Sequence, residues 1–122
     1  MLNEGLLKEL RERTIYHFLD ILILEALNDS SNYRSGRDLT NFIHKRFGVL
    51  IDAGLIYSVL LAMERKDLIR GFNKEVLEKR IKRFYELTEN GKELSEYLVK
   101  NREDVINFMK LVFKGNTKLI LQ

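Results

Sequence analysis

The sequence predicts a mainly α-helical protein with a small β-hairpin, which is an α+β fold. Three observations carry this prediction. Apolar residues recur at helical spacing along most of the chain, two short β-like runs lie between residues 68 and 87, and clusters of turn-forming residues separate the segments. With 122 residues, of which 45% are apolar, the chain is expected to form an ordered core.

The first half of the chain is predicted to be helical. Residues 2–12 place leucines on one face, whereas residues 14–27 are apolar on nearly every face, as expected for a buried helix. Ser35 can cap the following helix, in which Asp38 adds negative charge to the first turn and Gly48 marks the end.

The second half begins with a helix and continues as a hairpin. Asp52 can cap this helix. Its inward stripe contains Leu55, Val59, Leu60 and Met63. Residues 68–72 and 81–87 are predicted strands joined by a loop at 73–80, and Thr88 can cap the last helix.

This order of elements is that of a winged helix-turn-helix protein. In that arrangement the third helix can enter the major groove of DNA while the hairpin, or wing, touches the phosphate backbone. We therefore divide the chain into a winged-helix DNA-binding domain with N-terminal helices at 1–87, and a C-terminal dimerisation helix and tail at 88–122.

Positive charge is concentrated in the predicted wing. The chain has a net charge of +3, but residues 65–83 hold eight basic against three acidic residues, a local net charge of +5. Taken alone, such a run is more often a solvated surface than a binding site. On a wing, it favours a polyanionic partner, namely double-stranded DNA.

The composition argues against several other classes of protein. There is no cysteine, the two histidines are far apart, and no catalytic, phosphate-loop or dinucleotide motif is present, so we expect neither an enzyme nor a metal or other cofactor. No apolar run reaches the ~18–20 residues of a membrane helix. The N-terminus lacks the form of a signal peptide, so a cytoplasmic protein is expected.

Three segments resemble the PadR family of transcriptional regulators. LIYSVLLAMERKDLI (55–69) is similar to the family's third helix and the start of its wing, RFYELTENGKEL (83–94) to its Tyr-x-Leu-Thr-x-x-Gly wing closure, and ILILEAL (21–27) to its leucine-rich first helix. Asp67 stands where the family usually has glycine, and Asp tolerates the left-handed conformation that a turn there requires. The resemblance implies a dimeric, ligand-responsive regulator, often a repressor, of the short form with a single C-terminal helix.

The wing is expected to supply phosphate contacts, which give most of the affinity for DNA. The candidates are Lys79, Arg80, Lys82 and Arg83. Strand alternation places Lys82 and Arg83 on opposite faces, and we expect Lys82 to be the more exposed of the two.

The helices offer further candidates for DNA contact. Ser35 and Arg37 open the second helix, whose N-terminus favours anions, although Arg37 could equally pair with a nearby aspartate. On the third helix we expect contacts from Ala53, Tyr57 and Ser58, with the Tyr57 phenol either donating to a phosphate or supporting the helix. Because the first two turns lack Arg, Lys, Asn and Gln, we expect modest sequence specificity.

Two alternatives to a regulator are kept open. A non-specific architectural or chromatin protein would use the same cationic wing, and a winged helix can also act as a protein–protein adaptor. Val76 and Leu77 lie in the predicted wing tip, where we expect a loop folded back on its own domain. A partner contact or a wedge into a DNA groove is the alternative.

The last helix is predicted to form a homodimer interface. Its apolar stripe contains Leu98, Val105, Phe108 and Val112, with Asn101 as a polar position that can fix the register. We expect it to pair with the first helices of a second copy, near Leu6 and Leu10, although packing on its own first helix is an alternative. A small-molecule effector near Tyr16 and Phe18 is a further possibility at that interface.

Overall fold

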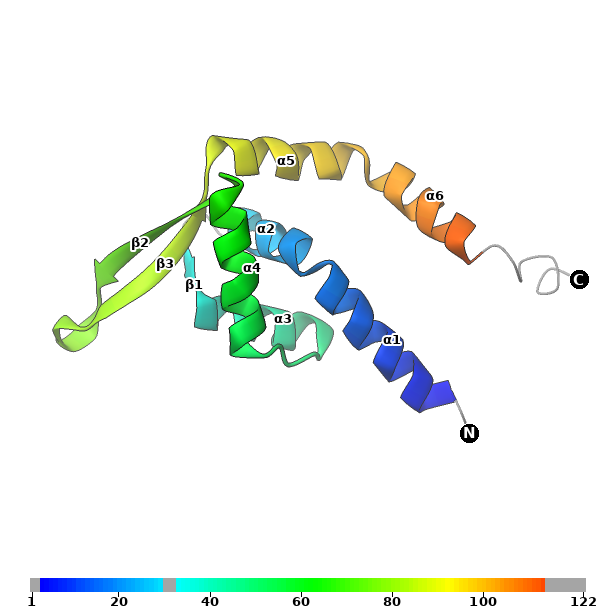
Figure 1. Ribbon diagram of the computed structural model, residues 1–122, viewed down its shortest axis with the longest axis horizontal. Coiled ribbons are helices and arrows are strands. Elements are labelled where there is room, and N and C mark those ends of the chain that lie inside the picture. Colours follow the sequence, from blue (N-terminus) through cyan, green and yellow to red (C-terminus); the bar gives the residue numbers. More distant parts are fainter. Residues whose placement is uncertain (1–2, 30–32, 114–122) are drawn as a thin grey trace, which may run out of the picture.

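Six helices and a three-stranded antiparallel sheet make up the described part of the chain in the computed structural model, residues 3–29 and 33–113 (Figure 1). The helices are α1 (Asn3–His17), α2 (Leu19–Asp29), α3 (Gly36–Phe47), α4 (Ala53–Arg65), α5 (Glu89–Lys100) and α6 (Arg102–Val112). The strands are β1 (Arg34–Ser35), β2 (Ile69–Glu75) and β3 (Ile81–Leu87), with a 3-10 turn, η1 (Leu77–Lys79), between the last two. The predicted α+β class is confirmed.

The sheet has the order β1-β3-β2, and β2 and β3 project from the helices as the predicted wing (Figure 1). Gly71 pairs with Tyr85 and Ser35 pairs with Phe84, which sets the register of both strand pairs. The sequence missed β1 because two residues cannot show a period-two alternation. Strand β2 is longer than predicted and runs to Glu75, so that the connecting loop is shorter.

Helix α2 forms the centre of the core. It contacts α1, α3, α4, α5 and β3, which explains why the predicted helix at 14–27 is apolar on nearly every side. Most core residues of the described chain come from α2, α3, α4 and the two wing strands, and they include Leu19, Ile23, Leu39, Ile43, Ile56, Leu60, Ile69 and Tyr85.

The predicted helix caps are present. Ser35 Oγ accepts a hydrogen bond from the Asp38 backbone at 3.1 Å, and the Ser35 backbone donates to Asp38 Oδ2 at 3.0 Å, which completes a capping box. Asp52 caps α4 by accepting from the Leu55 amide, and Thr88 caps α5 by accepting from the Gly91 amide, each without the reciprocal hydrogen bond of a capping box. Gly48 ends α3 in the left-handed conformation at φ 71°.

Two helix boundaries differ from the prediction. The first helix extends to His17, so the N-terminal helices meet at Phe18. The last helix is not continuous: Asn101, at φ −107° and ψ 13°, separates α5 from α6, and its side-chain amide donates to the Tyr97 carbonyl at 2.8 Å. An asparagine side chain that competes for backbone groups interrupts a helix in this way. The C-terminal tail from residue 114 lies outside the described residues.

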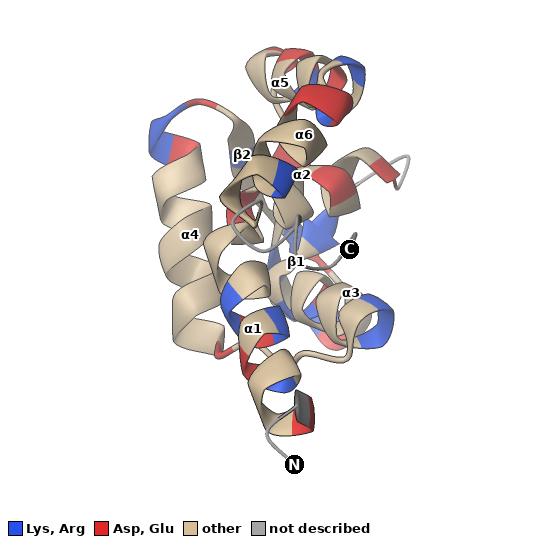
Figure 2. Cartoon of the chain, turned by 90° about the vertical axis from the view of Figure 1, so that its right-hand side faces the viewer, with Lys and Arg blue, Asp and Glu red and all other residues tan. Residues whose placement is uncertain are grey.

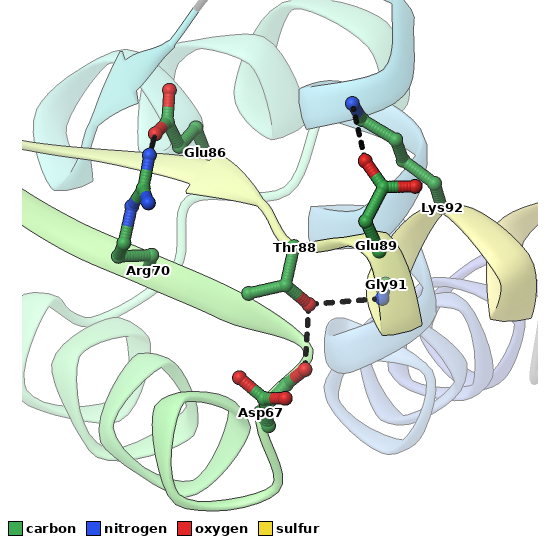
Figure 3. Close-up of polar contacts among 7 residues, drawn as sticks. All are labelled: Asp67, Arg70, Glu86, Thr88, Glu89, Gly91 and Lys92. Atoms are coloured by element: carbon green, nitrogen blue, oxygen red, sulfur yellow. Dashed lines mark hydrogen bonds and ion pairs between the residues drawn. The ribbon is translucent and has the colours of Figure 1, made fainter.

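The end of α4, the start of β2 and the start of α5 are joined at Thr88 (Figure 3). The Thr88 hydroxyl donates to the Asp67 carbonyl at 2.5 Å and accepts from the Gly91 amide at 3.1 Å. The Thr88 amide donates to the Leu68 carbonyl at 3.1 Å. Asp67 has φ 57°, the left-handed conformation anticipated for this position.

Gly91→Ala is expected to destabilise the fold strongly. A Cβ on Gly91 would lie 2.0 Å from the Leu68 carbonyl oxygen, a backbone atom that cannot move without disturbing the junction. The free energy of unfolding should fall by about 1–3 kcal/mol, the range for overpacked sites, and chemical denaturation would measure it. Gly5→Ala is the matched control, because nothing lies within 4 Å of its Cβ position. Equal effects of the two substitutions would contradict this account.

Candidate nucleic-acid interface

Helix α4 presents an uncharged exposed face. Its buried side contains Ile56, Leu60 and Met63, while Ala53, Tyr57 and Ser58 are exposed on the other side. Figure 2 shows α4 without charge along most of its length, with Lys, Arg, Asp and Glu gathered near its C-terminal end. The predicted helix contacts are therefore accessible together, and they offer hydroxyl and apolar groups rather than bidentate base-reading groups.

The Tyr57 ring bridges α4 and the start of α3. A Cβ on Gly36 would lie 2.8 Å from both Cζ and Oη of Tyr57, so the ring occupies space that only glycine leaves open. The side chain is nevertheless 51% exposed. Tyr57 therefore supports the helix packing while remaining half-exposed, and its contact with a phosphate stays a prediction.

The N-terminus of α3 differs from the prediction. Ser35 is only 2% exposed and its hydroxyl is used in the capping box, which leaves its side chain little access to DNA, and the predicted contact stays a prediction. The Asp38 carboxylate already occupies this helix end. Partial burial raises the pKa of Asp38, but the hydrogen bonds from Ser35 and the nearby charges of Lys82 and Arg34 outweigh it and lower the pKa below its usual value. Arg37 is exposed, with no ion pair among the described residues.

The wing cations do not all have the predicted environments. Lys79 and Arg80 are exposed near the tip, as a phosphate contact requires. The expectation that Lys82 is more exposed than Arg83 is wrong: Lys82 is half-buried with its ammonium 5.6 Å from the Phe84 ring centre, whereas the Arg83 side chain is 46% exposed. The predicted alternation is confirmed, but an aromatic cluster covers the Lys82 side.

That aromatic cluster lies on the wing face opposite α4. Tyr33 packs edge-on against Phe72 and Phe84, with ring centres 5.2 and 4.8 Å apart respectively. Lys74 contacts the Tyr33 ring at 4.5 Å and its hydroxyl, and it pairs in register with Lys82. Sequence reasoning did not identify Lys74 as a site residue. Its position across the hairpin from Lys82 would have indicated it once the register was known.

Two wing arginines are paired with glutamates. Arg70 of β2 pairs with Glu86 of β3 across the strands (Figure 3). Arg83 Nη2 lies 3.3 Å from Glu64 Oε2 in the last turn of α4. The Arg83 guanidinium also lies 5.7 Å from the Tyr85 ring centre. Burial raises the pKa of Tyr85, and the adjacent Arg83 charge partly offsets that effect.

The wing tip is not folded back on the domain as predicted. Leu77 is 87% exposed, and Val76 is half-buried. Glu78 and Lys79 have φ values of 62° and 58°, and this tight left-handed turn directs Leu77 outward. The two alternatives, a partner contact or a groove wedge, remain predictions.

Apolar side chains are exposed on α1 and α6. Leu6 is 56% exposed on α1, and Phe108 and Val112 are 64% and 61% exposed on α6. Leu98, by contrast, packs against the domain's own core. A cavity of about 690 Å³ lies between the start of α2 and α6. Its lining includes Phe18, Ile21, Val105, Ile106, Met109 and Phe113.

The described ranges define a winged-helix domain: a helix-turn-helix formed by α3 and α4, followed by a two-stranded wing. In residues 3–29 and 33–113 no helix is both long and apolar enough to cross a membrane. The same ranges hold no group of three or more His, Cys, Asp or Glu side chains that could bind a metal ion.

Comparisons with known proteins identify the family. Residues 23–96, more than half of the chain, match the model of the transcriptional regulator PadR-like family. Solved structures include a PadR family transcription regulator from Clostridium difficile R20291, at 26% identity and a TM-score of 0.65, covering 80% of this chain and 99% of that one. A PadR-like regulator from Bacillus cereus has 22% identity and a TM-score of 0.68, covering 84% and 98%. No curated protein sequence gives a match.

A further similar structure contains DNA. Bacillus subtilis PadR in complex with operator DNA has 24% identity and a TM-score of 0.58, with 66% of this chain and 46% of that chain covered. The chain belongs to the PadR-like family of transcriptional regulators. It is a DNA-binding transcriptional regulator, and the resemblance found in its sequence is confirmed.

Proposed function

We propose that the protein is a dimeric repressor that inserts α4 into the major groove of an operator and places its wing on the flanking phosphates. The observation that carries this proposal is the exposed, uncharged face of α4 beside a cationic β-ribbon. The complex of Bacillus subtilis PadR with operator DNA supports it by analogy. Nothing in the comparisons favours an architectural protein or an adaptor.

The proposed contacts divide into two groups. Lys79, Arg80 and Lys82 on the wing would neutralise phosphates, with Arg37 reaching the backbone from α3. The exposed side chains of Ala53, Tyr57 and Ser58 would face the groove, with the Tyr57 phenol free to donate. Groups of this kind support thymine-methyl contacts and shape readout, so we infer modest sequence specificity. We propose no catalytic step, and we place the regulator in the cytoplasm with its DNA.

The dimer would bury the exposed apolar faces of α1 and α6. Leu6 and Leu10 on α1, and Val105, Phe108 and Val112 on α6, have no partner within the described residues that covers them. Helices α1 and α6 extend away from the rest of the domain (Figure 1), and a second copy would cover their exposed apolar side chains. This favours pairing with a second copy over packing of α6 on its own α1. Asn101, at the helix break, would set the angle of α6 in the interface.

A small-molecule effector could occupy the apolar cavity at this interface. The cavity is lined in part by Phe18, whereas Tyr16 lines a different hollow next to α4. Its lining of two phenylalanines, three aliphatic residues and Met109, with Lys110 beside them, suits a planar aromatic ligand. A ligand there would touch α6 and α2, and would change the spacing of the two recognition helices.

Selection from a random DNA pool tests the proposed function. We expect enrichment of a two-fold symmetric site, with a site-to-random affinity ratio below about 10⁴, in the lower part of the range for specific binders. Arg80→Glu with Lys82→Glu should weaken binding at least tenfold and lower the magnitude of the salt slope by about 2, because each lost phosphate contact removes about 0.9. Lys92→Glu with Lys100→Glu on α5 is the matched charge control. If the wing variant bound DNA as tightly as the wild type does, the proposal would be contradicted.

Sedimentation tests the dimer. The wild-type protein should sediment as a dimer at micromolar concentration, and Phe108→Asp should shift it towards the monomer because a charge would be buried in an apolar interface. Asn107→Asp adds the same charge to a neighbouring exposed position of α6 and should have little effect. A wild-type monomer at this concentration would remove the dimer from the proposal.

Thermal unfolding in the presence of planar aromatic dyes tests the effector site. A dye that binds the interface should raise the melting temperature of the wild type, by linkage equivalent to about 2.7 kcal/mol at a hundredfold excess over its Kd. The Phe108→Asp monomer should show no such rise. An equal rise in both proteins would place the dye outside the dimer interface.

A further inference from the structure

One side chain ties the wing to the recognition helix. Arg83 of β3 lies with Nη2 3.3 Å from Glu64 Oε2 on α4, and with Nη1 3.4 Å from Asn73 Oδ1 on β2. Its guanidinium also covers the ring of Tyr85, which is buried in the core. Through these contacts Arg83 connects both wing strands with the last turn of α4.

Gly71 makes the position of Arg83 possible. A Cβ on Gly71 would lie 2.5 Å from Nη2 and 2.8 Å from Cζ of Arg83. Gly71 pairs with Tyr85, two residues along β3 from Arg83, so the guanidinium fills the space of the missing cross-strand side chain. This leaves the guanidinium beside Glu64, with part of its charge already neutralised.

We propose that Arg83 is a positioning residue that, paired with Glu64 over Gly71, fixes the angle between wing and recognition helix and does not itself neutralise a phosphate. This assignment rests on the proposed DNA-binding function, and it differs from the phosphate contact that the sequence predicted for Arg83. A wing held at a fixed angle needs less ordering when DNA binds, so the Arg83–Glu64 pair would increase affinity without touching the ligand.

The two possible roles of Arg83 predict opposite effects of a Glu64 substitution on the affinity for DNA. If Arg83 is a phosphate ligand, Glu64→Gln removes a negative charge near a polyanion, frees the guanidinium and should strengthen binding. If Arg83 is a positioning residue, Glu64→Gln breaks its anchor and weakens binding. Gly71→Ala provides an independent test, because it displaces the guanidinium without changing any charge.

Binding to a short mixed-sequence duplex, measured by fluorescence anisotropy over a salt series, separates these roles. We expect Glu64→Gln, Gly71→Ala and Arg83→Gln each to weaken binding about 2- to 5-fold, the range that an exposed ion pair supports. The salt slope should not change. The double substitution of Glu64 and Arg83 by glutamine should bind no more weakly than Arg83→Gln alone.

Two controls complete the experiment. Glu75→Gln removes an acid from the same ribbon that has no ion pair in the described chain, and it should leave binding unchanged or tighter. Arg83→Lys keeps the charge but loses the planar fork, so it should behave as Arg83→Gln does. Melting temperatures verify that each variant is folded at the temperature of measurement.

One pattern of results would overturn the positioning role of Arg83. Glu64→Gln or Gly71→Ala binding as tightly as the wild type or tighter, with Arg83→Gln weaker and its salt slope reduced in magnitude by about 1, would make Arg83 a phosphate ligand. A wild-type protein that retains no duplex would instead contradict the proposed function itself.

Discussion

The placement of the wing depends on the junction at Thr88. Its hydroxyl joins the end of α4 to the start of α5, and its amide holds the Leu68 carbonyl at the start of β2. Three elements therefore meet through one residue, with Asp67 in a left-handed conformation to turn the chain. Helix α4 and strand β2 are neighbours in the chain at this junction and diverge beyond it. A small change in backbone angle here would therefore produce a larger displacement of the wing tip.

Three glycines lie at contacts that fix the relative positions of the helices and the wing. They differ in which atoms lie against them. A side chain at Gly91 would meet a backbone carbonyl, so this position is constrained by the fold. At Gly36 and Gly71 it would meet the flexible ends of Tyr57 and Arg83, which can move aside. Gly36 and Gly71 therefore determine where the side chains of Tyr57 and Arg83 lie. A substitution at either glycine would change the proposed binding surface more than the stability of the fold.

Local chemistry made much of the fold predictable, whereas the site depended on tertiary contacts. Caps at Asp52 and Thr88 follow from short-range hydrogen bonding, so the helix starts could be read from the sequence. The break at Asn101 could not, because a polar residue in an apolar repeat also fits a continuous helix. The burial of Ser35 and the pairing of Arg83 with Glu64 involve partners set by the packing, which no charge count or alternation reveals.

The net charge of residues 65–83 overstates the number of cations that the wing can offer to DNA phosphates. Arg70 and Arg83 are each paired with a glutamate, and Lys82 lies partly under an aromatic ring. Only Lys79 and Arg80, among the wing residues that the sequence singled out, are exposed without an ion pair in the described chain. Electrostatic affinity scales with the phosphates that are neutralised, and not with the local sum of charge. In the proposed binding mode the remaining affinity would come from the fit of α4 to the groove, and that fit would depend on the angle at which the wing is held.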